Sequence, residues 1–205
     1  MNKDLLSFRP RALATLLGAA ALSAAALSGA ALSGAALSGA AQAAPYRAAE
    51  GTAAFSYRVA LVPVTGSMTG VAANVTLDPQ DLAATKGTVT VPVSTLKTGN
   101  TLRDSHAKGA GALGTAQFPN ATFELTSLTG GILTEGGQTV ATTATGRLTV
   151  KGTTKTLTAP IKATLRGGRV NVSTQFKFNP SDFNVRYPGG ANSVTVDVAF
   201  VLEAN

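Results

Sequence analysis

Four stretches in the second half of this chain alternate apolar and polar residues almost without interruption. They cover residues 146–151, 157–165, 170–178 and 194–203. Successive side chains of a β-strand point to opposite faces, so each stretch predicts a strand with one polar and one apolar face. This pattern is typical of antiparallel sheets, because strands of parallel sheets are apolar on both faces. The apolar faces must therefore pack against each other or enclose something.

The same criteria predict an all-β chain of eight strands in sequence order. Their expected ranges are 54–64, 67–77, 87–93, 121–128, 140–150, 157–165, 170–178 and 194–202. Short turns separate most of them, and Gly167-Gly168 is a strong hairpin signal. We expect a helical turn over residues 81–85, and a bulge or sheet edge at Pro63 inside the first strand.

Two architectures fit eight such strands. An eight-stranded antiparallel barrel leaves no edges and has an interior that holds side chains or one small ligand. A two-sheet sandwich with a filled core is the alternative, and would suit an exported structural or adhesive module. The alternation alone does not decide between a filled and a hollow interior.

Residues 1–43 have the pattern of a secretory signal peptide. Lys3, Arg9 and Arg11 precede a long apolar stretch, and Ala41-Gln42-Ala43 has small residues where signal peptidase requires them. We expect cleavage after Ala43, leaving residues 44–205 as one domain in the periplasm or outside the cell. A retained membrane anchor is the alternative, since the stretch is long enough to span a bilayer.

Composition excludes several functional classes. The chain has one histidine and no cysteine, which rules out disulfides, thiolate metal sites and sites with several histidine ligands. No nucleophile elbow, phosphate-binding loop or dinucleotide fingerprint is present. We therefore expect no enzyme and no cofactor, although an enzyme with His106 as base is a third hypothesis.

The net charge of +7 comes from scattered basic residues. They are not interleaved with aromatic residues, so we expect no nucleic-acid partner. Weak, transient contact with an anionic membrane surface is more plausible. The oligomeric state is left open.

One long connection, residues 98–120, shows neither the apolar–polar alternation of a strand nor the pattern of a long helix. Asn100 is suited to cap a short helix through His106, between the third and fourth strands. Excursions of this length in compact domains are usually functional or mobile. The charged cluster Arg103, Asp104 and His106 is either a solvated surface or a set of ligands for a polar head group at a cavity mouth.

Ordered motifs between the strands make the chain resemble the YceI-like family. They are residues 93–100 (Val-Ser-Thr-Leu-Lys-Thr-Gly-Asn), Arg103-Asp104, His106, Phe118-Pro119, Thr122-Phe123, residues 146–155 and Asn179-Pro-Ser-Asp-Phe-Asn184. The resemblance covers residues 49–203. It implies an extended, lipocalin-like eight-stranded antiparallel barrel, exported, with a pore that holds a long amphiphile such as a polyisoprenoid and no general catalytic step.

The predicted function is therefore an exported carrier whose barrel pore holds an isoprenoid or similar long-chain amphiphile. The predicted pore wall comprises Val59, Leu61, Val75, Val89, Val91, Phe123, Leu125, Leu148, Val150, Ile161, Leu165, Val172, Phe176, Val198 and Phe200. The head-group candidates are Arg103, Asp104, His106 and Arg186. Residues 107–114 are small where the family carries bulky residues, which predicts a wider or more mobile entrance.

Overall fold

The structure, a computed structural model, describes residues 42–205. The predicted signal peptide lies outside the described residues except for Gln42 and Ala43. Its cleavage therefore stays a prediction. No helix within the described residues is both long and apolar enough to cross a membrane.

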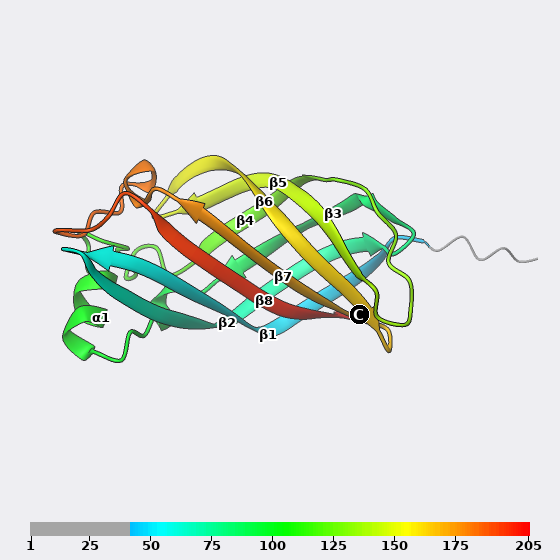
Figure 1. The fold of residues 1–205 in the computed structure, drawn as a ribbon, viewed down its shortest axis with the longest axis horizontal. Helices are drawn as coiled ribbons and strands as arrows, with labels where there is room; N and C mark the ends of the chain where they lie inside the picture. The colour runs from blue at the N-terminus through cyan, green and yellow to red at the C-terminus, as the bar shows by residue number, and fades with distance from the viewer. Residues whose placement is uncertain (1–41) are drawn as a thin grey trace, which may run out of the picture. The chain divides into compact units, whose positions relative to one another are not determined.

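Eight strands pair in chain order and close into one antiparallel barrel, because β1 pairs with β8 (Figure 1). The strands are β1 (Ala44–Val59), β2 (Val62–Asp78), β3 (Asp81–Val91), β4 (Ala121–Leu128), β5 (Thr139–Val150), β6 (Thr153–Arg166), β7 (Arg169–Phe178) and β8 (Val194–Ala204). The short helices are η1 (Val93–Thr95), α1 (Thr101–Lys108) and η2 (Pro180–Phe183). The predicted barrel is confirmed, and the two-sheet sandwich is wrong.

The alternation in the sequence becomes an apolar inside and a polar outside. Across β7 and β8, Val172 lies opposite Phe200, and both side chains are on the interior face. On the outside, threonine hydroxyls hydrogen-bond in pairs between β5 and β6, as between Thr145 and Thr158 at 3.1 Å. Such cross-strand pairs stabilise each strand contact on the face that meets water.

The first hairpin differs from the sequence expectation. The expected strand 54–64 is interrupted by a two-residue turn, in which Ala60 and Leu61 both have positive φ. Tight hairpin turns require positive φ, which Gly or Asn usually provides, so Ala-Leu gave no turn signal. The Ala60 N–H donates to the carbonyl of Gly189 at 2.7 Å and holds the turn in place. Pro63 lies in register opposite Arg58 on β1, so there is no bulge at this position. The expected sheet edge is confirmed, because β2 pairs with β3 only from Ala72 on.

Residues 81–85 are also strand, not the expected helical turn. They begin β3, and Asp78 pairs with Asp81 across a tight connection. The alternation of buried Leu82 and Thr85 with exposed neighbours is imperfect in this region. Pairing with β2 at Asp81 and Lys86, on either side of this stretch, and a hydrogen bond from the Leu82 N–H to the carbonyl of Gly131 at 3.1 Å fix the conformation, a tertiary effect that overrides local pattern.

The end of the barrel opposite α1 is closed by apolar side chains, which we call the plug: Leu77, Leu82, Leu133 and Val170. Each is at most 3% exposed. The connection between β4 and β5 folds over this end, with the Leu133 N–H donating to Pro79 at 2.7 Å. Backbone hydrogen bonds thus hold Leu133 in the interior although it lies outside any strand.

We expect Leu133→Ala to lower the free energy of unfolding by about 2–5 kcal/mol, the usual cost of truncating a buried leucine. Chemical denaturation of the purified protein measures this. Ile132→Ala is the matched control, because Ile132 is adjacent in sequence but 54% exposed; its effect should stay within about 0.5 kcal/mol. Equal effects of the two substitutions would contradict the plug.

Candidate ligand-binding cavity

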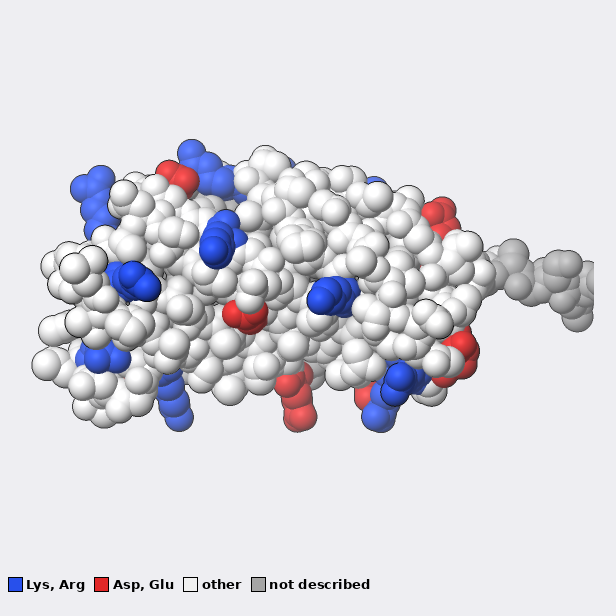
Figure 2. Space-filling model, viewed as in Figure 1, with Lys and Arg blue, Asp and Glu red and all other residues white. Residues whose placement is uncertain are grey.

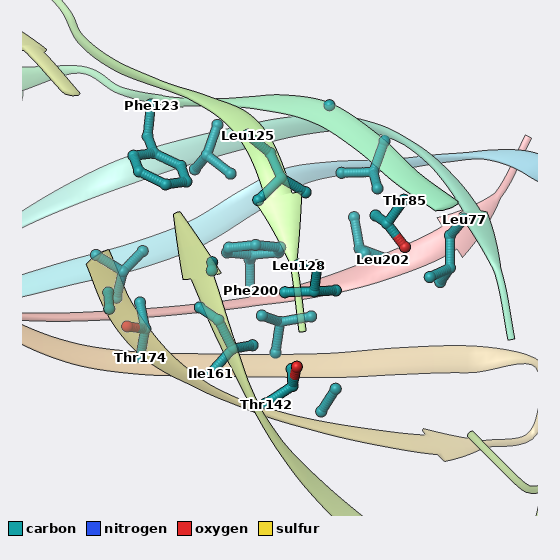
Figure 3. A pocket seen from close by; sticks show the side chains of 18 of the residues that line it. Leu77, Thr85, Phe123, Leu125, Leu128, Thr142, Ile161, Thr174, Phe200 and Leu202 are labelled. Carbon is teal, nitrogen blue, oxygen red and sulfur yellow. The ribbon is translucent and has the colours of Figure 1, made fainter. Parts of the chain in front are cut away.

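An apolar cavity of about 160 Å³ occupies the middle of the barrel (Figure 3). A water molecule needs about 10–15 Å³ in the same measure, so this space is far larger than a packing defect. Its wall includes predicted residues from seven strands, β2 to β8: Val75, Val89, Val91, Phe123, Leu125, Leu148, Ile161, Val172, Phe176, Val198 and Phe200. A cavity of this size counts against a filled core.

A second apolar cavity, of about 170 Å³, lies towards the end that carries α1. It shares Val91, Leu148 and Phe176 with the first cavity, so the two spaces adjoin. Its outer wall adds Leu113 and Tyr187, which belong to the connections after α1 and η2. The apolar space therefore extends from the plug to the opposite end, which we call the helix end.

Small side chains at inward positions leave this space open. Ala144 on β5 lies directly opposite Ala159 on β6, and both line the first cavity. In an eight-stranded barrel the interior is just wide enough for larger side chains to fill it. Alanine at these positions therefore leaves space unfilled, because the closed sheet cannot contract around a smaller side chain.

Three of the predicted wall residues lie elsewhere. Leu61 is in the β1–β2 turn and 86% exposed, so its assignment to the interior is wrong. Val59 is half-buried at the end of β1, where it pairs with Gly190, and lines neither cavity. Leu165 is buried at 8% exposure but likewise borders neither cavity. Alternation shows which residues of a strand face the interior. Whether an inward residue lines a cavity or packs at an end depends on its position along the barrel axis.

Other wall residues were missed by the sequence reasoning. Leu113, Val185 and Tyr187 come from irregular segments, where no periodicity exists to signal them. Ala144 and Ala159, in contrast, sit within alternating runs at inward positions. Small residues at such positions were a usable signal for an empty interior.

The wall of both cavities carries no charged side chain among the described residues. The polar side chains in the wall of the first cavity are four threonines: Thr122, and Thr85, Thr142 and Thr174, which are labelled in Figure 3. The Thr142 hydroxyl donates to the carbonyl of Thr129. The hydroxyls of Thr85 and Thr174 have no partner within residues 42–205, an arrangement that costs about 1–3 kcal/mol for each. The space suits an uncharged hydrocarbon chain.

The predicted short helix between β3 and β4 is confirmed as α1. Asn100 caps it, since its side-chain oxygen accepts from the Arg103 N–H at 2.9 Å. The carboxylate of Asp104 accepts from both the N–H and the hydroxyl of Thr98, at 2.8 and 2.6 Å. The Thr98 hydroxyl is the main cause of a lowered Asp104 pKa. These bonds attach α1 to the segment that pairs with β2 through Lys97 and Ser67.

The four head-group candidates lie at the helix end, and none lines either cavity in the described part of the chain. Asp104 is engaged by Thr98, and His106 is exposed on α1. Arg103 is half-exposed, and Arg186 is exposed, with its N–H donating to Gly111 at 3.4 Å. Their contact with a head group stays a prediction.

The small-residue stretch after His106 forms part of the second cavity. Ala112 is buried, and Leu113 is half-buried on the wall. The Lys151 ammonium donates to the carbonyls of Gly111 and Asn184, at 3.3 and 3.0 Å, and so connects this stretch to the segment after η2. The wider or more mobile entrance stays a prediction.

The described residues thus define a closed antiparallel β-barrel with an uncharged, apolar interior. The model of the YceI-like domain matches residues 46–204, and the chain belongs to this family. Protein YceI of Escherichia coli O6:H1 is 32% identical over 134 residues, which are 62% of this chain and 66% of that protein. The alignment therefore spans just under two thirds of the relative's length.

Two solved structures share the fold. A polyisoprenoid binding domain from Saccharophagus degradans, implicated in plant cell wall breakdown, has a TM-score of 0.65 and 13% identity, over 80% of this chain and 100% of that one. BcnA of Burkholderia cenocepacia has a TM-score of 0.64 and 22% identity, over 74% of this chain and 95% of that one. At these identities the likeness shows the fold alone.

We expect a carboxyl NMR titration to find the Asp104 pKa below its ordinary value of 3.8. A depressed folded pKa means that the stabilisation by Thr98 is present above the unfolded pKa and is lost as the pH falls through the folded one. Thr98→Val should raise the Asp104 pKa, whereas Thr98→Ser, which keeps the hydroxyl, should leave it low. An unchanged pKa in Thr98→Val would contradict the assignment.

Proposed function

We propose that this protein is an exported, non-catalytic carrier that holds the hydrocarbon chain of a long amphiphile, such as a polyisoprenoid, in its barrel. The observation that carries the proposal is the uncharged apolar space that extends from the plug to the helix end. An apolar space that reaches the end of the barrel suits a molecule with an apolar tail and a polar head, since the tail lies inside while the head stays near water.

Hydrocarbon burial supplies the affinity in this proposal. Each CH₂ group removed from water contributes about 0.8 kcal/mol. A charged or strongly polar ligand would lose its hydration against walls whose polar side chains are only threonines and tyrosines among the described residues. We therefore expect the protein to select ligands by the length and apolarity of their hydrocarbon chain, and not by hydrogen bonds along that chain.

Family membership and the polyisoprenoid binding domain of similar fold support a lipid-type ligand. The sequence pattern of residues 1–43 supports export, and an exported carrier would act in the periplasm or outside the cell. Binding without catalysis is proposed because the ionisable candidates, His106 among them, lie outside the cavity walls of residues 42–205.

Extraction of the purified protein with organic solvent, followed by mass spectrometry, tests the proposal directly. We expect a prenyl or acyl amphiphile in the extract, and uptake of fluorescent prenyl or acyl probes by the emptied protein. Protein that yields no such molecule and also takes up no probe would overturn the carrier function.

Filling the cavity should abolish uptake. We expect Ala144→Leu to lower probe affinity at least tenfold, because its side chain occupies the space opposite Ala159. Ala141→Leu is the matched control, since Ala141 lies on the same strand but is exposed on the outer face. Probe titration of both variants, with thermal unfolding as a check on folding, measures the difference. Equal affinities would place the ligand elsewhere.

A further inference from the structure

The helix end of the barrel exposes apolar side chains that no described residue covers. Leu61 and Val62, at the β1–β2 turn, are 86% and 58% exposed, and Leu102 on α1 is 65% exposed. Hydrogen bonds link these segments: Ala60 donates to Gly189, and Arg186 donates to Gly111 in the connection after α1. Figure 1 shows the β1–β2 turn and α1 at the same end of the barrel. We call Leu61, Val62 and Leu102 the apolar tips.

Basic residues surround these tips. They are Arg58 beside the turn, Lys97 before α1, Arg103 and Lys108 on α1, and Arg186 after η2. The ion pairs found in residues 42–205, Arg147–Glu124 and Arg169–Glu203, involve none of them. Asp104, the carboxylate on α1, is hydrogen-bonded to Thr98.

The opposite end carries charges of both signs, because Arg47, Arg166 and Arg169 lie there together with acidic residues. Glu50, Asp78, Asp81, Glu135 and Glu203 lie on the strand ends and connections there. On the face drawn in Figure 2, Lys and Arg gather around the helix end, and most Asp and Glu lie nearer the middle and the other end. The barrel therefore presents a basic end with exposed apolar side chains and an opposite end where acidic and basic residues are mixed.

We propose that the helix end docks onto the surface of an anionic phospholipid bilayer. Apolar side chains that enter the acyl boundary and cations that meet lipid phosphates are the two components of peripheral membrane binding. Charge complementarity favours an anionic surface, because the five cations outnumber the acidic residues at this end, Asp104 and Asp182, and none of the five forms an ion pair within residues 42–205. Docking in this orientation presents the second cavity to the bilayer, since Leu113 and Tyr187 line it at the same end.

The geometry also favours a planar surface over a groove-filling partner. The basic and apolar side chains come from separate segments at the helix end of the barrel, and none of them lines either cavity of the described residues. A lipid surface can contact all of them at once, and each cation near it adds about fivefold in binding. A rise in ionic strength weakens such contacts, because it screens charges over about 10 Å or less.

Co-sedimentation of the mature protein with phosphatidylcholine vesicles, with and without phosphatidylglycerol, tests the proposal. We expect binding only when phosphatidylglycerol is present, and loss of binding at high salt. The triple variant Leu61→Ser, Val62→Ser, Leu102→Ser should bind at least tenfold more weakly, because its apolar contacts are lost. The double variant Arg58→Gln, Arg186→Gln should bind about twentyfold more weakly.

Matched variants away from the helix end serve as controls. Ile132→Ser with Val201→Ser removes exposed apolar side chains elsewhere, and Arg47→Gln with Lys86→Gln removes exposed cations near the opposite end. Both should bind vesicles as the unaltered protein does. No binding to anionic vesicles, equal binding without phosphatidylglycerol, or equal losses in the control variants would overturn the proposal. So would a sedimentation profile in which the tips instead hold two copies of the chain together.

The test does not depend on the carrier function. Ala144→Leu, which fills the cavity, should still bind anionic vesicles, because its outer surface is unchanged. Failure of probe uptake with normal vesicle binding would therefore overturn the carrier proposal alone. Normal uptake without vesicle binding would overturn docking alone.

Discussion

Closure of the sheet is the constraint on which the rest of this structure depends. Once β1 pairs with β8, the eight strands form one closed barrel, and the apolar faces have only the interior to occupy. The circumference of the barrel is then set by its backbone hydrogen bonds. Its interior volume cannot shrink when inward side chains are small. Alanines such as Ala144 and Ala159 consequently leave a cavity instead of a tighter core.

The two ends of the barrel differ because their connections differ. At one end, short turns and the β4–β5 connection bring Leu82 and Leu133 into the interior, where they close it. At the other end, α1 and the segment after η2 are held at the rim by hydrogen bonds from Thr98 and Lys151. Leu113 and Tyr187 border the second cavity there without filling it. The two ends of the interior are therefore different, and the proposed carrier and docking functions both depend on this difference.

Much of the fold could be predicted from local pattern. The ranges of β4, β5, β7 and β8 agree with the expected strands within a few residues, and the Asn100 cap correctly predicted α1. The errors fall where local signals are weak. The Ala60–Leu61 turn lacks Gly or Asn, and β3 begins in a segment whose strand conformation depends on pairing with β2. Leu61 was assigned inward for the same reason, since an uninterrupted strand would have continued its alternation.

The sequence by itself determined which residues face the interior of the later strands, because side-chain direction alternates strictly with position along a strand. It also determined the charge, the absence of cysteine and the family motifs. Only the tertiary structure decided which inward residues line a cavity and which close an end, because that depends on the stagger of the strands and on the paths of the connections. It also decided that Leu61, Val62 and Leu102, distant in sequence from Arg186, lie at one end of the barrel. Contacts between segments far apart in the chain have no local signal.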